Sequence, residues 1–306
     1  MALTDNIVAY YKLDESSGNA ADSVGSRNMT NNNTTPFVAG KINNGADLES
    51  GSSQNFTYTT DSYGIATTGD RSMQAWIKLE SNPTSGNTYT IFIHGESLAN
   101  FRVDIYNNSG TMELRSVRNN AGFNNTSSYS IDLNDGLYHH IAQTVSYSGG
   151  TFTIKVYIDG VERISHTSNF STNTNSITGF KLGTLSLADG APYYFDGIID
   201  EAGIWSRALS SAEVLSLYSG GNGTQYPFTT TTMTASSGSF TTTFVSANFS
   251  VGVVMIASVG SIVSTFNNAT FILTGTSWSN PVTKNSSTWS NSVSKNTSLW
   301  SNQIKY

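Results

Sequence analysis

The sequence predicts an all-β protein: two antiparallel sheets packed as a sandwich, followed by a smaller β-rich C-terminal region. Short apolar or alternating segments recur along the first 222 residues, and turns rich in Gly, Asn, Asp and Ser separate them. Hardly any stretch has helical spacing, and strands nowhere alternate with helices. The chain also lacks a glycine-rich phosphate loop. These observations favour a β-sandwich.

Local patterns predict the individual strands. Apolar residues at every second position from Met73 to Leu79 indicate a half-buried strand, with Trp76 on its second face. The two alternating segments that flank Gly149-Gly150 predict an antiparallel pair. In chain order, the expected strands are 6–13, 45–48, 56–58, 72–79, 90–94, 101–106, 112–117, 137–145, 151–158, 161–165, 180–183 and 198–205.

One short helix is expected after the last of these strands. Ser210 stands at the N-cap position and Glu213 follows three residues later, which is the spacing of a capping box. Leu209 and Val214 can form a hydrophobic staple around the cap. The Gly220-Gly221 pair is the expected end of the helix.

Composition excludes several classes of protein. The net charge is −6 and only 12% of residues are charged, so no basic field is available for nucleic acid. Cysteine is absent, which removes disulfides, thiolate metal sites and cysteine nucleophiles. The first residues show neither a basic nor an apolar leader segment, so we expect no signal peptide. The abundance of Ser, Thr, Asn and Gly suits extracellular or virion surfaces.

The chain changes character beyond residue 222. We expect a linker over 223–234 and a β-rich region over 235–306 that serves in assembly or anchoring. Residues 229–306 contain three Lys and no acid. The most apolar segment, 251–265, contains Ser and Gly and is shorter than the roughly 20 apolar residues of a membrane span. We therefore expect two strands around Gly260 and no membrane insertion.

An 11-residue repeat occupies residues 276–306. Trp278, Trp289 and Trp300 are in register, and identical Trp residues at a fixed period bury their rings against a neighbouring unit or chain. We assign these three residues to assembly and expect a homo-oligomer, with a trimer favoured because closure hides strand edges. Helical coiled coils can also have an 11-residue period. Ser, Thr and Asn are poor helix formers, which argues against that alternative.

No catalytic arrangement is evident, and we expect no enzyme activity. A glycanase needs two carboxylates on one face, and residues on one face of a strand alternate. Asp200 and Glu201 are adjacent, so alternation would place them on opposite faces. His139 and His140 are adjacent as well, and we interpret them as structural rather than catalytic.

Three blocks of sequence carry a family resemblance: SMQAWIKL, GLYHHIAQTVSYSGGTFTIKVYIDGVERI and FKLGTLSLADGAPYYFDGIIDEAGIWSRALSSAEVLSLY. In their order and spacing, residues 5–222 resemble the concanavalin A-like jelly roll of the laminin G-like and pentraxin-like group. The resemblance implies two stacked, curved antiparallel sheets with a concave face that often contacts glycans. The jelly-roll domain is expected to occupy residues 1–222.

The resemblance also implies a structural calcium ion. Asp200 stands where family members often place a metal-binding carboxylate, and Asp14 follows the first strand, which would pair nearby. Carboxylates and loop carbonyls are the oxygen ligands that calcium prefers. The alternative for Asp200 is hydrogen bonding to backbone amides or an ion pair with Arg207.

The functional hypothesis is a non-enzymatic virion surface protein that presents a lectin-like domain for adhesion or glycan contact. It would be a phage head-fibre, decoration or tail-fibre component, since its Trp-repeat tail resembles those of phage virion surface proteins. Its partners would be other virion proteins and surface glycans. The alternative is a secreted bacterial carbohydrate-binding or adhesin module, outside the cell or on its surface. Ligand-binding residues stay unassigned; the aromatic candidates are Tyr63, Tyr129, Tyr193 and Tyr194.

Overall fold

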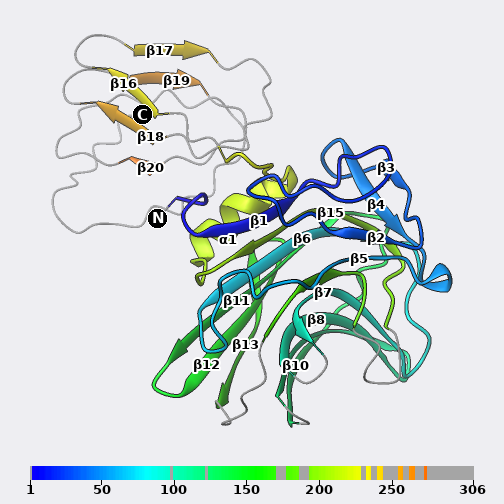
Figure 1. Cartoon of the computed structure of the whole chain (residues 1–306). Coiled ribbons are helices and arrows are strands. Elements are labelled where there is room, and N and C mark those ends of the chain that lie inside the picture. Colours follow the sequence, from blue (N-terminus) through cyan, green and yellow to red (C-terminus); the bar gives the residue numbers. More distant parts are fainter. Residues whose placement is uncertain are drawn as a thin grey trace. The chain divides into compact units, whose positions relative to one another are not determined.

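The computed structural model describes residues 2–96, 99–120, 123–169, 177–185 and 193–228, and five short strands beyond them. The chain divides into two compact units, and Met1–Thr231 is the main segment of the first (Figure 1). Among the described residues, no helix is long and apolar enough to cross a membrane.

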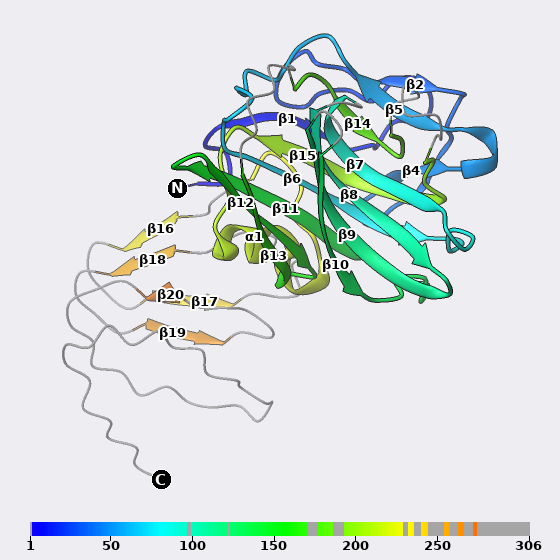
Figure 2. The same ribbon diagram turned by 90° about the horizontal axis from the view of Figure 1, so that it is seen from below.

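Two antiparallel sheets form the first unit, and Figures 1 and 2 show them from two sides. The first sheet contains β1 (Ile7–Tyr11), β3 (Phe37–Ala39), β4 (Asn44–Leu48), β6 (Arg71–Leu79), β11 (His139–Ser148), β12 (Thr151–Ile158), β13 (Val161–Asn169) and β15 (Gly197–Trp205). Its order is β13-β12-β11-β6-β15-β4-β3, with β1 also paired to β15.

The second sheet contains β2 (Thr30–Asn32), β5 (Asn55–Tyr58), β7 (Thr88–Glu96), β8 (Ala99–Asn108), β9 (Thr111–Asn120), β10 (Phe123–Ser130) and β14 (Phe180–Leu182). Its order is β10-β9-β8-β7-β14-β5-β2. The prediction of an all-β sandwich with two antiparallel sheets is confirmed. Strands β2, β3 and β10 were not expected, because they are short or lack alternating apolar residues.

Side chains along the strands of the first sheet alternate between its two faces, so each face buries a different set of residues. On β6, every second residue from Met73 to Leu79 is at most 2% exposed and lies in the main core between the sheets. Trp76 points to the other face, as predicted, and its ring stacks on Tyr218 with 5.8 Å between the centroids. The first sheet is therefore buried on both faces in this region.

Helix α1 (Ser211–Tyr218) covers part of the outer face of the first sheet. Its residues Val214 and Leu217 pack against Ala142, Tyr157 and Trp205 in a second apolar cluster. The cluster explains why all nine residues of β15 are buried, since one face of the strand meets the main core and the other meets this cluster.

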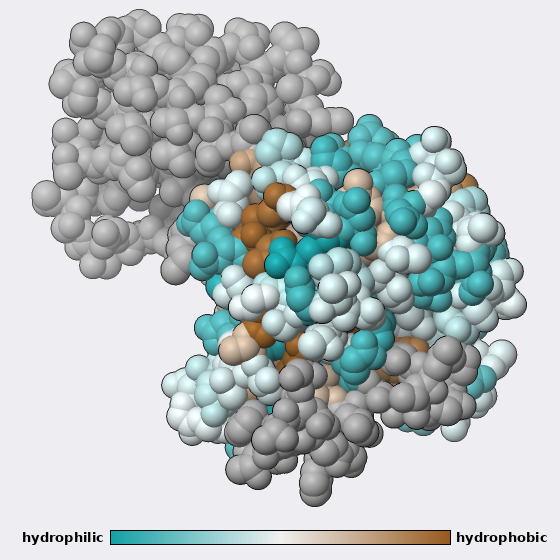
Figure 3. Space-filling model, in the orientation of Figure 1, coloured by the Kyte–Doolittle hydropathy of each residue, from teal (hydrophilic) through white to brown (hydrophobic). Residues whose placement is uncertain are grey.

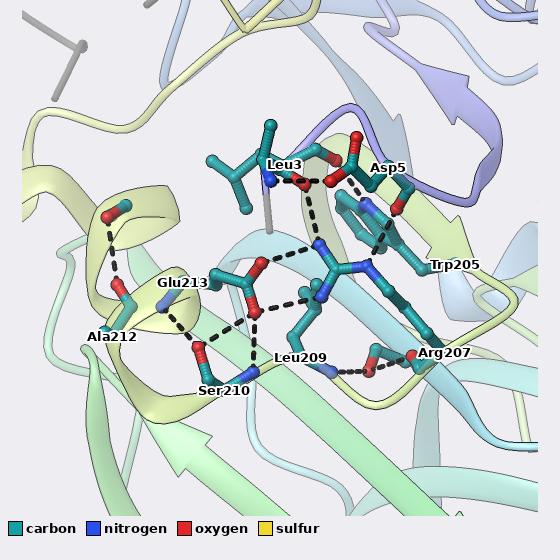
Figure 4. A network of polar contacts seen from close by, with 11 residues as sticks. Leu3, Asp5, Trp205, Arg207, Leu209, Ser210, Ala212 and Glu213 are labelled. Atoms are coloured by element: carbon teal, nitrogen blue, oxygen red, sulfur yellow. Dashed lines mark hydrogen bonds and ion pairs between the residues drawn. The ribbon is translucent and has the colours of Figure 1, made fainter.

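Arg207 links the start of α1 to the N-terminal segment (Figure 4). Arg207 Nη2 lies 2.7 Å from Glu213 Oε1, and the same guanidinium donates to carbonyl oxygens near the N-terminus. Glu213 also accepts a hydrogen bond from the backbone N–H of Ser210, which completes the predicted capping box. The alternative that Arg207 pairs with Asp200 is wrong, because the first turn of α1 places Glu213 beside the guanidinium.

The helix ends at Tyr218, two residues before the predicted glycine pair. Ser219 has φ 50°, in the left-handed region, and its N–H donates to the carbonyl oxygen of Leu215. The 3₁₀ helix η3 (Ser219–Gly221) then contains both glycines. A second short 3₁₀ helix, η1 (Ser50–Ser52), follows β4.

Replacing Ser210 with Ala is expected to lower the free energy of unfolding by about 1 kcal/mol, because the N–H of Glu213 loses its acceptor. Urea unfolding monitored by circular dichroism measures the difference. Ser211→Ala is the matched control, since Ser211 is the first helical residue and does not cap. Equal midpoints for the two variants would contradict a stabilising role for the capping box.

Residues 223–228 belong to the body of the first unit, so the predicted linker over 223–234 is wrong for this part. The Tyr10 hydroxyl donates to the Thr224 carbonyl oxygen at 3.0 Å. The rings of Tyr226 and Phe228 lie 5.9 and 5.4 Å from the Tyr10 ring. These aromatic residues extend the apolar cover of the first sheet beyond α1, which is a tertiary role that composition does not reveal.

The second unit contains parallel strands. The described ones are β16 (Thr232–Ala235), β17 (Phe240–Thr243), β18 (Val254–Ala257), β19 (Ile262–Thr265) and β20 (Ile272–Leu273). Strands β16, β18 and β20 form one ladder, and β17 and β19 form another. The β16–β18 and β17–β19 pairs both join residues 22 positions apart. Two strands flank Gly260, as predicted, but they join different sheets.

The Trp repeats lie outside the described residues. Trp278, Trp289 and Trp300 all fall in this part of the chain. Their assignment to assembly, and the domain bounds proposed for this region, stay predictions.

Candidate functional site

The outer face of the second sheet carries polar side chains at alternate positions. On β8, Phe101, Val103 and Ile105 lie in the main core, so the residues between them point to the opposite face. Strands β7 and β9 place hydroxyl and guanidinium groups beside those residues. We call this set the polar face: Thr88, Thr90, Asn100, Arg102, Asp104, Tyr106 and Arg115.

Asp104 is the centre of the polar face. Its side chain is fully buried, and its Oδ2 lies 2.8 Å from Arg102 Nε. Thr90 Oγ1 donates to Asp104 Oδ1 at 3.0 Å, and Arg115 Nη2 lies 3.9 Å from Oδ2. Arg102 Nη1 donates to Asn100 Oδ1 at 3.0 Å. Two guanidinium groups share one carboxylate, so the polar face has one positive charge in excess.

Tyr106 and Arg115 form the partly exposed part of the polar face. The Arg115 guanidinium lies 3.9 Å from the centroid of the Tyr106 ring, and 21% of the Arg115 side chain is exposed. Arg115 Nη2 donates to Thr88 Oγ1 at 3.0 Å, whereas Arg115 Nε is buried and has no hydrogen-bond partner among the described residues. A partly exposed aromatic ring beside a partly exposed guanidinium can stack on a sugar and donate to its hydroxyls.

The tyrosines proposed as sugar-stacking residues have different surroundings. Tyr63 is buried in the main core, with its hydroxyl 2.8 Å from that of Tyr11. Tyr129 packs against the core and under the Arg163 guanidinium. Tyr193 is bonded to the polar face through its backbone, since its carbonyl accepts from the Thr90 N–H at 3.2 Å. Sequence reasoning missed the polar face, although polar and apolar residues alternate strictly from 100 to 106.

A cluster of carboxyl groups lies beside β15. We call it the acid site, formed by Asp14, Asp200, Glu201 and Gln225. Because β1 pairs with β15, with Tyr11 opposite Ala202, Asp14 comes close to Glu201, whereas the family resemblance implied Asp200 as its neighbour. Gln225 Nε2 joins the two carboxylates, donating to Asp14 Oδ2 at 2.9 Å and to Glu201 Oε1 at 2.6 Å. Gln225 was not expected here, because it lies in the predicted linker.

Asp200 is fully buried and, unlike Asp14 and Glu201, is not hydrogen-bonded to Gln225. Its Oδ2 accepts from the Ile42 N–H at 2.9 Å. A Cβ atom at Gly40 would come within 2.7 Å of this oxygen, so only glycine leaves room for the carboxylate. Asp14 accepts instead from the Asn44 N–H at 3.1 Å. Asp14 and Asp200 thus accept hydrogen bonds from the same segment, residues 42–44, but from different residues of it.

A β-bulge changes the direction of Glu201. The register between β15 and β6 shifts between Asp200 and Gly203, and Glu201 has φ 51°. Both carboxylates consequently lie near Tyr10, where burial and then the charges of Glu201 and Asp200 raise the pKa of the phenol. The prediction that Asp200 and Glu201 face opposite sides is wrong, because strict alternation fails at a bulge.

The acid site contains buried carboxylates that suit a hard cation, but its three acids do not all lie within 4.8 Å of one another. Burial raises the pKa of Glu201 to about 8, and burial together with the charge of Glu201 raises the pKa of Asp200. Asp200 Oδ1 and Glu201 Oε2 are buried without hydrogen-bond partners among the described residues. Neither group forms an ion pair there. Orphaned carboxylate oxygens of this kind are suitable calcium ligands. Calcium at Asp200 and Asp14 stays a prediction.

A second group of acids lies at the ends of β4 and β6. Carboxylate oxygens of Asp47, Glu49 and Glu80 all lie within 4.8 Å of one another. Burial and then the charge of Asp196 raise the pKa of Asp47. Glu49 and Glu80 are exposed to solvent, where acidic groups need no ion. Asp47 and Glu49 stand two residues apart, which is the sequence signal for one shared face.

The two adjacent histidines have separate surroundings. His139 lies between Asp159, 2.8 Å from Nδ1, and Asp135, 3.2 Å from Nε2. The hydrogen bonds to these carboxylates raise the pKa of His139. His140 is fully buried, with Nε2 2.8 Å from Gln74 Oε1, and burial lowers its pKa to about 3. The interpretation of both histidines as structural stays a prediction.

Comparison with solved structures finds the same sandwich in binding domains. Domain 4 of AbnA, a GH43 extracellular arabinanase from Geobacillus stearothermophilus, in complex with arabinotriose, is 23% identical with a TM-score of 0.50. The match covers 69% of this chain and 97% of that domain.

Two toxin structures also match. The binding domain of Paraclostridial Mosquitocidal Protein 1 is 14% identical, with a TM-score of 0.55, and the match covers 71% of this chain and 53% of that domain. A structure of botulinum neurotoxin type C, whose cell entry depends on two ganglioside molecules, is 15% identical, with a TM-score of 0.55 and coverages of 70% and 51%. The chain therefore spans about half the length of these toxin chains. At such identities the likeness concerns the fold alone.

The family is decided by the sequence match. No curated protein matches the chain. The profile of the concanavalin A-like lectin/glucanases superfamily matches residues 50–215, which is more than half of the chain and includes strands of both sheets. The chain belongs to the concanavalin A-like lectin/glucanases superfamily.

Proposed function

We propose that this chain is a non-enzymatic, lectin-like adhesion protein of a virion surface, and that its polar face contacts glycans. The observation that carries the proposal is the stacking of the partly exposed Tyr106 ring against the Arg115 guanidinium, whose side chain is 21% exposed. Sugar rings combine apolar C–H faces with many hydroxyls, so stacking and directed hydrogen bonds together recognise them.

The surface of the first unit suits polar recognition. In Figure 3 the described residues of this view are mostly teal and white, with small brown areas. Among the described residues, large apolar side chains are exposed only at Leu137, Val161 and Leu215. A partner that docks through a broad apolar surface would need a larger patch than these residues provide.

Binding rather than hydrolysis is supported by the position of the acids. Asp200 and Glu201 are both fully buried, out of reach of a polymeric substrate. The polar face holds a single carboxylate, Asp104, which its two arginine neighbours keep in an ionic network. A glycosidase needs two carboxylates about 5–10 Å apart across the scissile bond.

Calcium has a structural role in this proposal. Asp200 and Glu201 would hold the ion and Asp14 would lie beside it, so the ion would neutralise buried acids and brace the ends of the domain. The acid site is on the side of the first sheet, and none of its residues belongs to the polar face. Calcium would therefore support the fold without touching the glycan.

The virion role is supported by the C-terminal region. Two parallel strand pairs repeat with a 22-residue offset, and an 11-residue Trp repeat follows them in the sequence. Such periodicity is typical of elongated, self-associating stalks. We propose a homo-oligomer, with a trimer favoured, that displays the first unit and contacts other virion proteins.

One observation favours the alternative of a secreted bacterial carbohydrate-binding module. The matched arabinanase domain comes from an extracellular enzyme and was solved with arabinotriose. In this alternative the chain would be a monomer, whereas a virion fibre self-associates. Light scattering of the full chain separates the two: a closed oligomer supports the virion proposal, and a monomer favours the secreted module.

Glycan contact is tested on a glycan array with the full chain. Tyr106→Ala is expected to remove most binding, because it deletes the stacking ring and the support of Arg115. Tyr138→Ala is the matched control, since Tyr138 is partly exposed and hydrogen-bonded elsewhere, to the Ala39 carbonyl. Equal binding by the Tyr106 variant and the wild type would place the glycan site elsewhere.

A further inference from the structure

A cavity lies on the outer face of the first sheet, on the opposite side of the sandwich from the polar face. Its volume is about 230 Å³. Outward residues of β11 and β12 form the floor, and the segment 208–211 that enters α1 forms a wall. We call it the back cavity. It is built entirely from described residues.

Hydroxyl groups dominate the lining. Thr144 and Ser146 on β11 alternate with core residues, and Thr153 on β12 is the register partner of Ser146. Ser211 contributes a fourth hydroxyl from the wall. Ser146, Thr153 and Ser211 make no side-chain hydrogen bond within the described protein, so their donors and acceptors are available to a ligand.

A neutral ion pair lies at the edge of the cavity. Lys155 Nζ donates to Glu162 Oε2 at 2.9 Å, and both side chains are more than a third exposed. The Tyr157 hydroxyl lies 3.4 Å from the same oxygen. The ammonium and the other carboxylate oxygen, Oε1, remain able to bind adjacent hydroxyls of a ligand. The pair has no net charge, so the back cavity offers no net electrostatic attraction to an anionic or a cationic ligand.

We propose that the back cavity binds a single neutral sugar ring. Four hydroxyls and an ion pair match the alternating donors and acceptors of a polyhydroxylated ring. The volume of about 230 Å³ lies below the roughly 300–1,000 Å³ of pockets for drug-sized ligands, which suits one ring rather than an oligosaccharide. The absence of net charge disfavours phosphorylated or acidic sugars.

The proposal goes beyond the glycan contact of the polar face and does not depend on it. Side chains of the back cavity point away from the main core on the first sheet, whereas those of the polar face point away from it on the second. The sandwich would thus contact sugars on two opposite sides. Two weak sites on one domain raise avidity toward a dense glycan surface without a new contact at either site.

The test is saturation-transfer NMR on the full chain, with methyl β-D-glucoside, methyl β-D-galactoside and methyl α-D-mannoside as neutral probes. Methyl glucuronide is the anionic comparison. We expect transfer to at least one neutral probe, and weaker transfer to the glucuronide. The double variant Ser146→Ala with Thr153→Val removes two hydroxyls and should weaken binding of that probe roughly tenfold. Thr153→Trp fills the cavity and should abolish binding.

Thr167→Val is the matched control. Thr167 is the register partner of Thr153 on the neighbouring strand and is exposed on the same face, but it does not line the cavity. Equal losses for Thr167→Val and the double variant would overturn the proposal, as would the absence of transfer to all neutral probes. Loss of transfer with Tyr106→Ala alone would also overturn it, while leaving the proposed function of the polar face intact.

Discussion

Replacing Glu201 with Gln is expected to stabilise the calcium-free protein at high pH by several kcal/mol, and to leave its stability at low pH nearly unchanged. The folded protein raises the pKa of Glu201 from 4.5 to about 8, chiefly by burial. Below pH 4.5 the carboxyl group is protonated in the folded and unfolded states alike, so it carries no penalty. Between 4.5 and 8 the unfolded state ionises first, and stability falls as pH rises.

The expected gain in stability follows from the difference between the unfolded and folded pKa values of Glu201. Each unit of pKa difference corresponds to about 1.4 kcal/mol, which gives at most roughly 4–5 kcal/mol above pH 8. Gln keeps the shape and the acceptor for Gln225, so the gain reflects the lost charge. Denaturant unfolding at several pH values, in the presence of a chelator, measures it. A wild type whose stability is flat across the window would contradict the buried, neutral Glu201.

If the acid site binds calcium, the ion should make the wild type more stable than the Glu201→Gln variant at high pH. The ion binds the ionised carboxylate, so it should raise the melting temperature of the wild type, and more so above pH 8 than near pH 5. Glu201→Gln and Asp200→Asn should both lose this response. Glu49→Gln is the matched control, because Glu49 belongs to the exposed acidic group at β4 and β6. Loss of the response in the Glu49 variant alone would show that the ion binds to that exposed acidic group instead.

Replacing Asp104 with Ala is expected to cost about 3–5 kcal/mol of unfolding free energy, because it leaves the Arg102 guanidinium without its carboxylate. The Thr90 hydroxyl also loses its acceptor. Asp104→Asn is the matched control, since it keeps the size and one acceptor and should cost less. Chemical denaturation at neutral pH compares the variants. Equal stabilities of the Ala variant and the wild type would contradict the role of Asp104 as the centre of the network.

A double variant separates stability from binding at the polar face. Arg102→Met with Asp104→Leu replaces the buried ion pair by apolar groups of similar volume, which often restores stability. We expect the double variant to fold but to lose glycan binding on the array, because Arg115 loses its neighbouring charges. Retained glycan binding would show that the network only supports the fold.

The sequence by itself determined the elements whose signals are local. The alternation from Met73 to Leu79 identified β6 and its two faces, because the side-chain period of a strand is two. The capping box of Ser210 and Glu213 located the start of α1, because both partners lie within four residues. Asp14 was expected beside β15, although that expectation rested on the family resemblance rather than on spacing.

Only the tertiary structure decided the surroundings of the functional groups. The bulge at Glu201 turned two adjacent carboxylates to one side, which strict alternation forbids. Gln225 reached Asp14 from more than 200 residues away in the chain, and Asp104 met its hydroxyl and guanidinium partners through pairing with two other strands. Such contacts depend on register and strand order, which arise from the packing of the whole sandwich and leave no trace in neighbouring residues.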